Sequence, residues 1–186
     1  MTDAATAVIE GLPEATPLCS LVIPGSHDTM TSACTHPYYR TQALSLSEQL
    51  DVGVRYIDLR LTRTMVAAHR EWVSGTTAAR ILDVLRSHLA EHPRDFLLAR
   101  IQNANEAKDD FERYGEALRA VISENLDLFW RPTGTPGGTV WPTIGRIRGR
   151  HPGTASRGSA GGRGPFRGMA TAASSSRTTG TARTSR

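Results

Sequence analysis

The regular alternation of short apolar runs with amphipathic helical patterns constrains the fold of this chain more than any other feature. Strand-like runs are expected at 18–23, 55–62, 65–69 and 95–102, and helices at 45–53, 77–91 and 109–129. Strands that alternate with helices form a mainly parallel sheet, and the connecting helices cover its faces. The sequence therefore predicts an α/β fold.

Local signals set the bounds of these elements. Ser45 or Ser47 is a candidate N-cap for the first helix, which is expected to end near Gly53. The second helix is expected to end before Pro93. In "RYIDLRLT" apolar and polar residues alternate, so Asp58 and Arg60 are expected on one face of a strand.

Length and composition limit the class of protein. The 186 residues suffice for one domain, but a complete eight-stranded α/β barrel typically takes about 250 residues. No apolar run approaches the roughly 20 residues of a membrane-spanning helix, so no transmembrane segment is expected. The first residues lack a basic start and an apolar core, so no signal peptide is expected and the localisation stays open. Cys19 and Cys34 are expected to be reduced.

The net charge of +4 conceals two different regions. All 18 acidic residues precede residue 128, whereas nine arginines lie from Arg146 onward. Residues 150–186 are rich in Arg, Gly, Ser and Thr, and such a segment buries too little apolar area to offset its ordering entropy. A disordered tail is therefore expected there. Its arginines could attract anionic lipid or nucleic acid, but the lack of pattern favours a solvated end, and no nucleic-acid partner is expected.

Polar side chains gather at the ends of the predicted strands: His27, Asp28, Asp58, Arg60 and His69. Strand ends of a parallel sheet or barrel meet at one edge, so these residues are expected to share a cleft. Imidazole titrates near pH 6.5, so two histidines can act as general base and general acid, and a guanidinium suits phosphate oxygens. Without a nucleophile elbow, this set favours phosphoryl transfer over acyl transfer.

Each of these residues also has a structural interpretation. His27 and Asp28 could form a loop turn that caps a helix, Asp58 and Arg60 could form an ion pair, and His69 could simply end a strand. Collecting so many polar groups at adjacent strand ends is costly unless they act together, which favours the functional interpretation. The other histidines, His36, His88 and His92, are expected in loops or on helix surfaces.

Several motifs, in order and spacing, resemble the bacterial phosphatidylinositol-specific phospholipases C. They are "IPGSHDTMT", "LSLSEQLDVGVRYIDLRLT", a strand ending in "AAH", "HPRDFLLARI" and "WPTIGRIRG". The resemblance implies a distorted TIM barrel, of which residues 18–149 would form roughly the first half. Residues 1–17 would then be an N-terminal extension and 150–186 the tail.

The resemblance also implies an activity and a set of roles. The family cleaves phosphatidylinositol into diacylglycerol and a cyclic inositol phosphate without a metal, so no cofactor or metal is expected. By position, His27 would be the general base and His69 the general acid, with Asp28 oriented against His69. Arg60 would stabilise the phosphorane charge and Asp58 would position that site. The implied partner is phosphatidylinositol or a related phospholipid, bound peripherally at a membrane surface; the family is often secreted.

The chain departs from the family pattern at several places. Arg70 follows His69 where the family usually has glycine, and Gln102 and Asn103 stand where some members carry a lysine. The aspartate that orients the general base lies late in the family's barrel, and this chain has no acidic residue after Gly149. The change in composition there is what a shifted reading frame in GC-rich DNA would produce, a hypothesis that resequencing the gene would test.

Two other functions stay open. The first is a related barrel phosphodiesterase that acts on glycerophosphodiesters or sphingolipids, which usually needs a metal held by acidic residues. The second is a non-catalytic remnant that binds anionic lipid through its tail.

Overall fold

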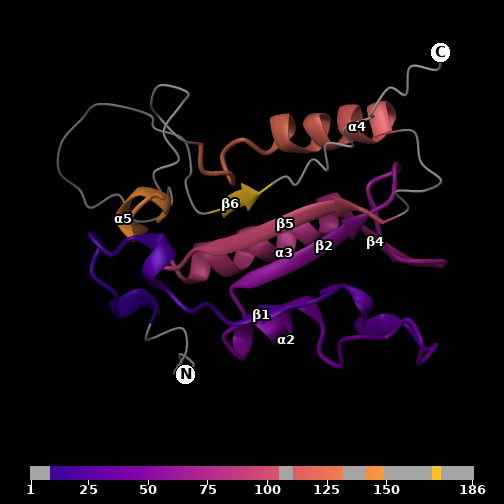
Figure 1. The fold of residues 1–186 in the computed structure, drawn as a ribbon, viewed down its shortest axis with the longest axis horizontal. Coiled ribbons are helices and arrows are strands. Elements are labelled where there is room, and N and C mark those ends of the chain that lie inside the picture. Colours follow the sequence, from indigo (N-terminus) through magenta and orange to yellow (C-terminus); the bar gives the residue numbers. More distant parts are fainter. Residues whose placement is uncertain (1–8, 105–110, 132–140, 149–168, 173–186) are drawn as a thin grey trace, which may run out of the picture.

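The computed structural model describes residues 9–104, 111–131, 141–148 and 169–172. One mixed sheet runs through the molecule in the order β4-β3-β2-β5-β6, with β1 paired to β2 (Figure 1). The strands are β1 (Gly25–Ser26), β2 (Tyr56–Leu61), β3 (Val66–His69), β4 (Trp72–Thr77), β5 (Leu97–Asn103) and β6 (Met169–Ala172). The helices are η1 (Leu18–Ser20), η2 (Thr31–Ala33), α2 (Leu46–Asp51), α3 (Ala78–Glu91), α4 (Phe111–Glu124) and α5 (Ile144–Ile147).

The centre of the sheet is parallel, as the sequence predicts. β2 pairs in parallel with β5 along its whole length, and Asp58 stands opposite Arg100. β1 is parallel to β2, and β6 is parallel to β5. α3 lies behind the sheet in Figure 1 and connects the β3–β4 hairpin to β5.

The β3–β4 hairpin differs from the expectation. The run at 65–69 does form a strand, but β3 is antiparallel to β2, and the unpredicted strand β4 folds back on β3. Only four residues separate β2 from β3, whereas a parallel connection needs a dozen or more. The short link therefore forces β3 to run back along β2.

The predicted starts of the first two helices are confirmed, and the start expected at 109 lies outside the described residues. The Ser45 side chain accepts a hydrogen bond from the Glu48 amide, and the Glu48 carboxylate accepts from the Ser45 amide, so a capping box begins α2. Gly53 follows the helix at φ 95°, a left-handed conformation that favours glycine. Thr77 caps α3 by accepting a hydrogen bond from the amide of Arg80.

The core lies between the sheet and its helices. Alternate residues of β2 and β5 point into it and meet the apolar side of α3: Ile57, Leu59, Leu61, Leu97, Ala99, Ile101, Ile81, Leu82, Leu85 and Leu89. Partly buried side chains of α4 pack against the same cluster. The opposite face of β2 carries Asp58 and Arg60. The result is a curled half barrel with helices on its outer side, which confirms the predicted α/β, TIM-barrel-like class.

The strand expected at 18–23 does not form. Leu18–Ser20 is a 3₁₀ helix, and the pairing with β2 begins only at Gly25. Pro24 has no amide hydrogen, so it can contribute only its carbonyl oxygen to the pairing. This oxygen accepts hydrogen bonds from the amides of Arg55 and Tyr56 at 2.9 and 3.0 Å. Leu18 is buried instead in a second apolar cluster with Phe96 and residues of α5.

Arg148, in the segment "WPTIGRIRG", ties that second cluster to the N-terminal segment. Its guanidinium donates to the carbonyl oxygens of Leu12 at 2.9 Å and Glu10 at 3.2 Å, and also to that of Ile9. Burial lowers the pKa of Arg148. The side chain thus holds together parts of the chain more than 130 residues apart.

His88 is buried, not at the helix surface as expected. Its Nε2 lies 3.0 Å from Asp95 Oδ2, and the same oxygen lies 2.7 Å from Arg55 Nε. Arg55 and Asp95 are both fully buried. A polar triad therefore crosses the core between β2, α3 and the start of β5, and the apolar stripe of α3 gave no sign of it.

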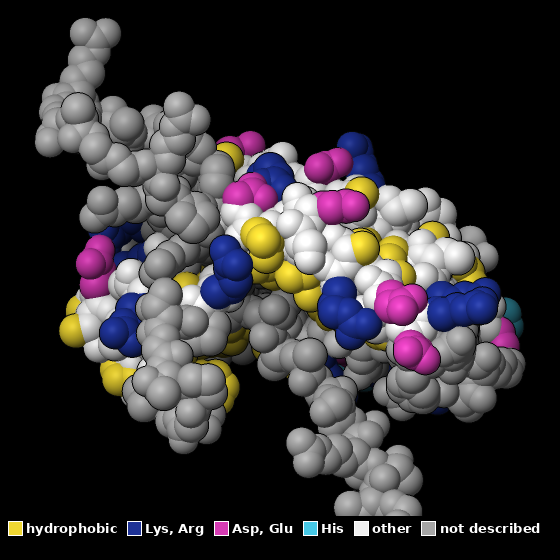
Figure 2. Space-filling model, turned by 90° about the horizontal axis from the view of Figure 1, so that it is seen from above, with side chains coloured by type: hydrophobic (Ala, Val, Ile, Leu, Met, Phe, Trp, Pro, Cys, Tyr) yellow, Lys and Arg dark blue, Asp and Glu magenta, His cyan; other side chains and the backbone are white. Residues whose placement is uncertain are grey.

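Most of the predicted tail lies outside the described residues. Met169–Ala172 differ from the expected disorder, because they form β6 on the edge of β5. Among the described residues, no helix has the length and hydropathy to cross a membrane. On the face shown in Figure 2, acidic and basic side chains are interspersed over the described surface, which is typical of solvated helices.

Candidate active site

The five predicted residues meet at one place. His27 and Asp28 follow β1, Asp58 and Arg60 project from β2, and His69 ends β3. The sequence predicted that His69 would end a parallel strand. Instead, β3 is antiparallel to β2, so its last residue, His69, lies beside the loop that follows β1. The two carboxylates and His69 are buried, whereas the side chain of His27 is 66% exposed.

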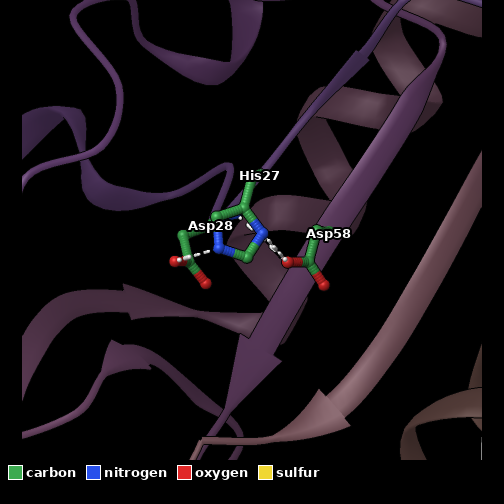
Figure 3. A group of neighbouring side chains, drawn as sticks. All are labelled: His27, Asp28 and Asp58. Carbon is green, nitrogen blue, oxygen red and sulfur yellow. Dashed lines mark hydrogen bonds and ion pairs between the residues drawn. The ribbon is translucent and has the colours of Figure 1, made fainter.

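The His27 ring lies between two carboxylates (Figure 3). Its Nδ1 is 3.0 Å from Asp58 Oδ2, and its Nε2 is 3.1 Å from Asp28 Oδ2. The carboxylate side chains are only 1% and 3% exposed. Both ring nitrogens thus face a carboxylate, and one of them must be released before His27 can accept a proton from a substrate.

The loop after β1 is fixed to β2 by main-chain contacts. The Asp28 amide donates to Asp58 Oδ2 at 3.2 Å, the Thr29 amide donates to the Asp58 carbonyl at 3.1 Å, and the Asp58 amide donates to Thr29 Oγ1 at 2.9 Å. Asp28 has φ 49°, in the left-handed region that few residues other than glycine, asparagine and aspartate adopt. Such backbone strain is typical of functional sites.

His69 binds the same aspartate from the other side. Its Nε2 is 3.2 Å from Asp28 Oδ2, and its Nδ1 is 2.9 Å from the carbonyl oxygen of Tyr39. A carbonyl can only accept a hydrogen bond, so Nδ1 carries a proton. A second proton on Nε2 would face Asp28, which is the arrangement that a general acid needs.

Arg60 supplies the positive charge of the cluster. Its Nε contacts Asp28 Oδ1 and lies 3.5 Å from Asp58 Oδ2, while its side chain remains 24% exposed. The guanidinium has further N–H groups with which to bind an anion. It therefore both pairs with the carboxylates and offers donors to a phosphate.

A metal could find ligands at this place only in competition with Arg60. Donor atoms of His27, Asp28 and Asp58 all lie within 4.8 Å of one another. Arg60 already contacts both carboxylates, so a divalent cation would have to displace a guanidinium or sit beside it against charge repulsion. The donor set is thus poorly suited to a metal while Arg60 keeps this position.

The β3–β4 turn holds the segment that orients His69. Arg70 donates from Nη1 to the Tyr38 hydroxyl at 3.1 Å, and its guanidinium lies 5.3 Å from the centre of that ring. A hydrogen bond to Glu71 raises the pKa of Tyr39. Arg70 has φ 55°, which explains why glycine suits this position. Residues 70 and 71 of the turn therefore contact the side chains of Tyr38 and Tyr39, and the carbonyl oxygen of Tyr39 in turn contacts His69 Nδ1.

A pocket of about 220 Å³ opens beside His27. Its wall consists of Gly25, Ser26, His27, Tyr56, Asp58 and Arg100. A larger pocket of about 290 Å³ lies between α2 and α3, and none of the five cluster residues lines it. The pocket that adjoins the histidine–carboxylate cluster is thus the smaller of these two.

The fold is similar to that of barrel proteins of the phosphatidylinositol-specific phospholipase C type. The chain is homologous to "1-phosphatidylinositol phosphodiesterase" of Listeria monocytogenes, with 28% identity over 148 residues, which are 76% of this chain and 46% of that protein. It is also homologous to the human "PI-PLC X domain-containing protein 1", with 32% identity over 53% of this chain and 41% of that protein. A comparison with protein-family models finds no match.

Solved structures agree with the fold. Phosphatidylinositol-specific phospholipase C from Listeria monocytogenes superimposes with a TM-score of 0.70 at 25% identity, over 77% of this chain and 54% of that chain. The enzyme of Staphylococcus aureus gives a TM-score of 0.61 at 21% identity, over 75% of this chain and 49% of that chain, and supports the fold alone. The chain therefore spans about half the length of the relatives it matches.

Some contacts of the site had no sequence signal. The Tyr39 carbonyl reaches His69 across 30 residues of chain, and a main-chain acceptor leaves no mark in a sequence. The His27 carbonyl accepts from Gln42 Nε2 at 2.6 Å and Thr41 Oγ1 at 3.1 Å, in a loop without a recognised pattern. Arg100 had a signal, because it alternates with apolar residues in "LLARIQ" and stands opposite Asp58.

Proposed function

We propose that this chain is a phosphatidylinositol-specific phospholipase C-like phosphodiesterase, which cleaves phosphatidylinositol into diacylglycerol and a cyclic inositol phosphate without a metal. The observation that carries the proposal is the buried Asp28 carboxylate with a histidine on each side, 3.1 Å from His27 and 3.2 Å from His69. Homology to the Listeria and human proteins supports the same reaction class.

In the first step His27 acts as general base. With Nδ1 held by Asp58, Nε2 is the nitrogen that receives the proton of the inositol 2-hydroxyl. Nε2 now faces Asp28 Oδ2, which also contacts His69 Nε2, so the substrate hydroxyl must enter between the His27 ring and that oxygen. The exposed His27 ring can shift to admit the hydroxyl, while Asp28 keeps its contact to Arg60 through Oδ1 and its contact to His69 through Oδ2.

In the same step the inositol 2-oxygen forms a bond to phosphorus, and the bond from phosphorus to the diacylglycerol oxygen breaks. His69 gives its Nε2 proton to the departing oxygen, so diacylglycerol leaves as an alcohol. Arg60 donates hydrogen bonds to the phosphoryl oxygens, whose negative charge increases in the transition state. Protons and charges balance, because the proton taken by His27 replaces the proton lost by His69.

Measurement of diacylglycerol release from phosphatidylinositol vesicles, with chelator present, tests the proposal. His27→Ala and His69→Ala should each lower kcat about 10²-fold or more, as expected for loss of a general base or acid. His92→Ala is the matched control, because this histidine lies at the far end of α3 and its ring pairs with Glu10. Equal rates for all four proteins would contradict the assignment.

A second enzymatic function has one observation in its favour, the three donor atoms of His27, Asp28 and Asp58 within 4.8 Å of one another. A metal-dependent barrel phosphodiesterase that acts on glycerophosphodiesters or sphingolipids would use such ligands. Activity that calcium or magnesium restores after chelation would favour this alternative. Full activity in chelator supports the metal-independent reaction.

The peripheral membrane partner belongs to the same proposal. A phospholipase C must meet its lipid at a membrane surface, and the exposed His27 ring and Arg60 donors are on the accessible side of the cluster. Co-sedimentation with phosphatidylinositol vesicles tests the interaction. If a non-catalytic remnant binds lipid only through its tail, deletion of residues after Gly149 abolishes binding, and no lipid is cleaved by the intact chain.

A further inference from the structure

One short segment between η2 and α2, residues 39–42, contacts both histidines of the proposed reaction. At its start, the Tyr39 carbonyl oxygen lies 2.9 Å from His69 Nδ1. At its end, Gln42 Nε2 donates a hydrogen bond to the His27 carbonyl oxygen at 2.6 Å. The position of the general base relative to the general acid therefore depends on where this segment lies.

Thr31, the first residue of η2, holds this segment in place. Its hydroxyl oxygen accepts hydrogen bonds from the main-chain amides of Thr41 at 3.0 Å and Gln42 at 3.1 Å, and it lies 2.7 Å from Thr41 Oγ1. Thr31 is only 2% exposed, so water competes little for these bonds. The buried hydroxyl thus joins the loop that carries His27 to segment 39–42.

The chemistry of the two threonine hydroxyls sets the direction of these hydrogen bonds. A hydroxyl oxygen has two lone pairs and carries one proton. Two amides donate to the Thr31 oxygen, so its own proton goes to Thr41 Oγ1. The Thr41 proton is then left for the carbonyl oxygens of His27 at 3.1 Å and Asp28 at 3.3 Å. A series of hydrogen bonds therefore runs from segment 39–42 through Thr31 and Thr41 to the main chain of the catalytic loop.

The main chain of His27 has to stay in place while its ring moves. In the proposed reaction the exposed ring shifts to admit the substrate hydroxyl, so its contacts to the carboxylates cannot fix the residue throughout. The contacts of Thr41 and Gln42 are made to the carbonyl oxygen and do not depend on the ring. Placement of this kind matters for rate, because a shift of about 1 Å can cost about 10²-fold.

We infer that Thr31 is a positioning residue, which fixes the proposed general base and general acid relative to each other through segment 39–42. The inference rests on the proposed function. The Thr31 hydroxyl acts on Thr41 and Gln42, which in turn hold His27, so its contribution is placement and not proton transfer. Valine has nearly the shape of threonine without the hydroxyl, and serine keeps the hydroxyl without the methyl group. The two substitutions therefore separate hydrogen bonding from packing.

Release of diacylglycerol from phosphatidylinositol vesicles by these variants tests the inference. Thr31→Val should lower kcat about tenfold and leave KM nearly unchanged, because placement of the reacting groups is impaired and lipid binding is not. Thr31→Ser should keep most of the wild-type kcat. Thr77→Val is the matched control, because it also removes a hydroxyl that accepts from a main-chain amide, but at the start of α3. An unchanged kcat in Thr31→Val, or equal losses in Thr31→Val and Thr31→Ser, would overturn the inference.

Thr41→Val keeps the inference testable if Thr31→Val does not fold. Thr41 is exposed, so its replacement disturbs the packing little, but it removes the hydroxyl that donates to the carbonyl oxygens of His27 and Asp28. We expect kcat to fall in Thr41→Val and to be largely kept in Thr41→Ser. A folded Thr41→Val with full kcat would overturn the inference, because the link from Thr31 to His27 would then have no effect on the rate.

A measurement without turnover separates this inference from the proposed reaction. The proton on His69 Nδ1 faces the Tyr39 carbonyl and is protected from exchange with water, so nuclear magnetic resonance of the full chain with isotopically labelled histidine should detect it. Its absence from His69→Ala assigns the signal. Thr31→Val should shift or broaden this signal, whereas Thr31→Ser and Thr77→Val should keep it. Such a change supports the positioning link even if the wild type cleaves no lipid. An unchanged signal in Thr31→Val, or no such signal in the wild type, overturns the inference even if lipid is cleaved.

Discussion

The Nδ1 atom of His27, in the loop that follows β1, lies 3.0 Å from Oδ2 of Asp58 on the neighbouring strand β2. Asp58 is buried, and its position is fixed by hydrogen bonds with the amides of Asp28 and Thr29 and with the Thr29 hydroxyl. The resemblance places the aspartate that orients the general base late in the family's barrel, and residues 150–186 contain no acidic residue. A carboxylate within the first half of the barrel thus occupies the position of an orienting partner.

Replacement of Asp58 by asparagine tests this relationship. The amide has the same shape, but it binds the His27 imidazole without a charge and can impose the wrong tautomer, so kcat for phosphatidylinositol should fall about 10²-fold. KM should change less, because His27 touches the reacting hydroxyl. Asp83→Asn on the exposed side of α3 is the control and should keep full activity. A kcat for Asp58→Asn within twofold of the wild type would show that Asp58 does not orient the base.

The sequence predicted the elements whose signals are local and missed those set by distant contacts. The capping box at Ser45, the alternation in β2 and the apolar stripe of α3 each lie within one short window, and each prediction is confirmed. The strand at 18–23 was wrong because its apolar residues serve another cluster. The β3–β4 hairpin was missed because pairing direction depends on the length of the connection, which periodicity does not report.

The same distinction holds for the site. Side chains alternate between the two faces of β2, so the sequence could predict that Asp58 and Arg60 lie on the same face. The partner of His69 is the main-chain carbonyl of Tyr39, and its neighbour Tyr38 is held by a turn 32 residues away. Long-range contacts to main-chain atoms depend on the path of the loop, which no residue pattern in the sequence encodes.

Replacement of Arg70 by glycine should separate stability from activity. Glycine accepts the φ of 55° without strain, so the free energy of unfolding should stay the same or rise by up to about 1 kcal/mol. However, the hydrogen bond from Arg70 to the Tyr38 hydroxyl is lost. This loss removes part of the restraint on the neighbouring Tyr39 carbonyl, which contacts His69. We expect kcat to fall about fivefold, the equivalent of about 1 kcal/mol for one hydrogen bond.

Urea unfolding and lipid turnover of the same preparations measure the two effects of the turn substitution. Tyr38→Phe removes the hydroxyl that accepts from Arg70 and keeps the ring, so it should lower kcat without relieving the backbone. The double variant should lose little more than either single variant, because both remove one contact. Additive losses in kcat, or a fall in stability for Arg70→Gly, would contradict the positioning role of the turn.

Replacement of Asp95 by alanine should destabilise the fold strongly. Asp95 Oδ2 lies 2.7 Å from Arg55 Nε and 3.0 Å from His88 Nε2, and all three side chains are buried. Removal of the carboxylate leaves the Arg55 charge without its counter-ion, which costs about 3–5 kcal/mol. Denaturant unfolding measures the change. Asp51→Ala at the exposed end of α2 is the control, and a cost for Asp95→Ala no larger than that control would refute the triad's structural role.

The capping box of α2 should contribute to stability in a pH-dependent way. The hydrogen bond from Ser45 lowers the pKa of Glu48 in the folded chain. A lowered carboxyl pKa stabilises the fold above the unfolded value, near pH 4.3, and this contribution is lost as pH falls through the folded pKa. The unfolding free energy of the wild type should therefore exceed that of Glu48→Gln at pH 6, and the difference should shrink below about pH 4. Glu91→Gln at the exposed end of α3 should show no such trend, and a difference for Glu48→Gln that is equal at pH 6 and pH 3.5 would contradict the ionic part of the cap.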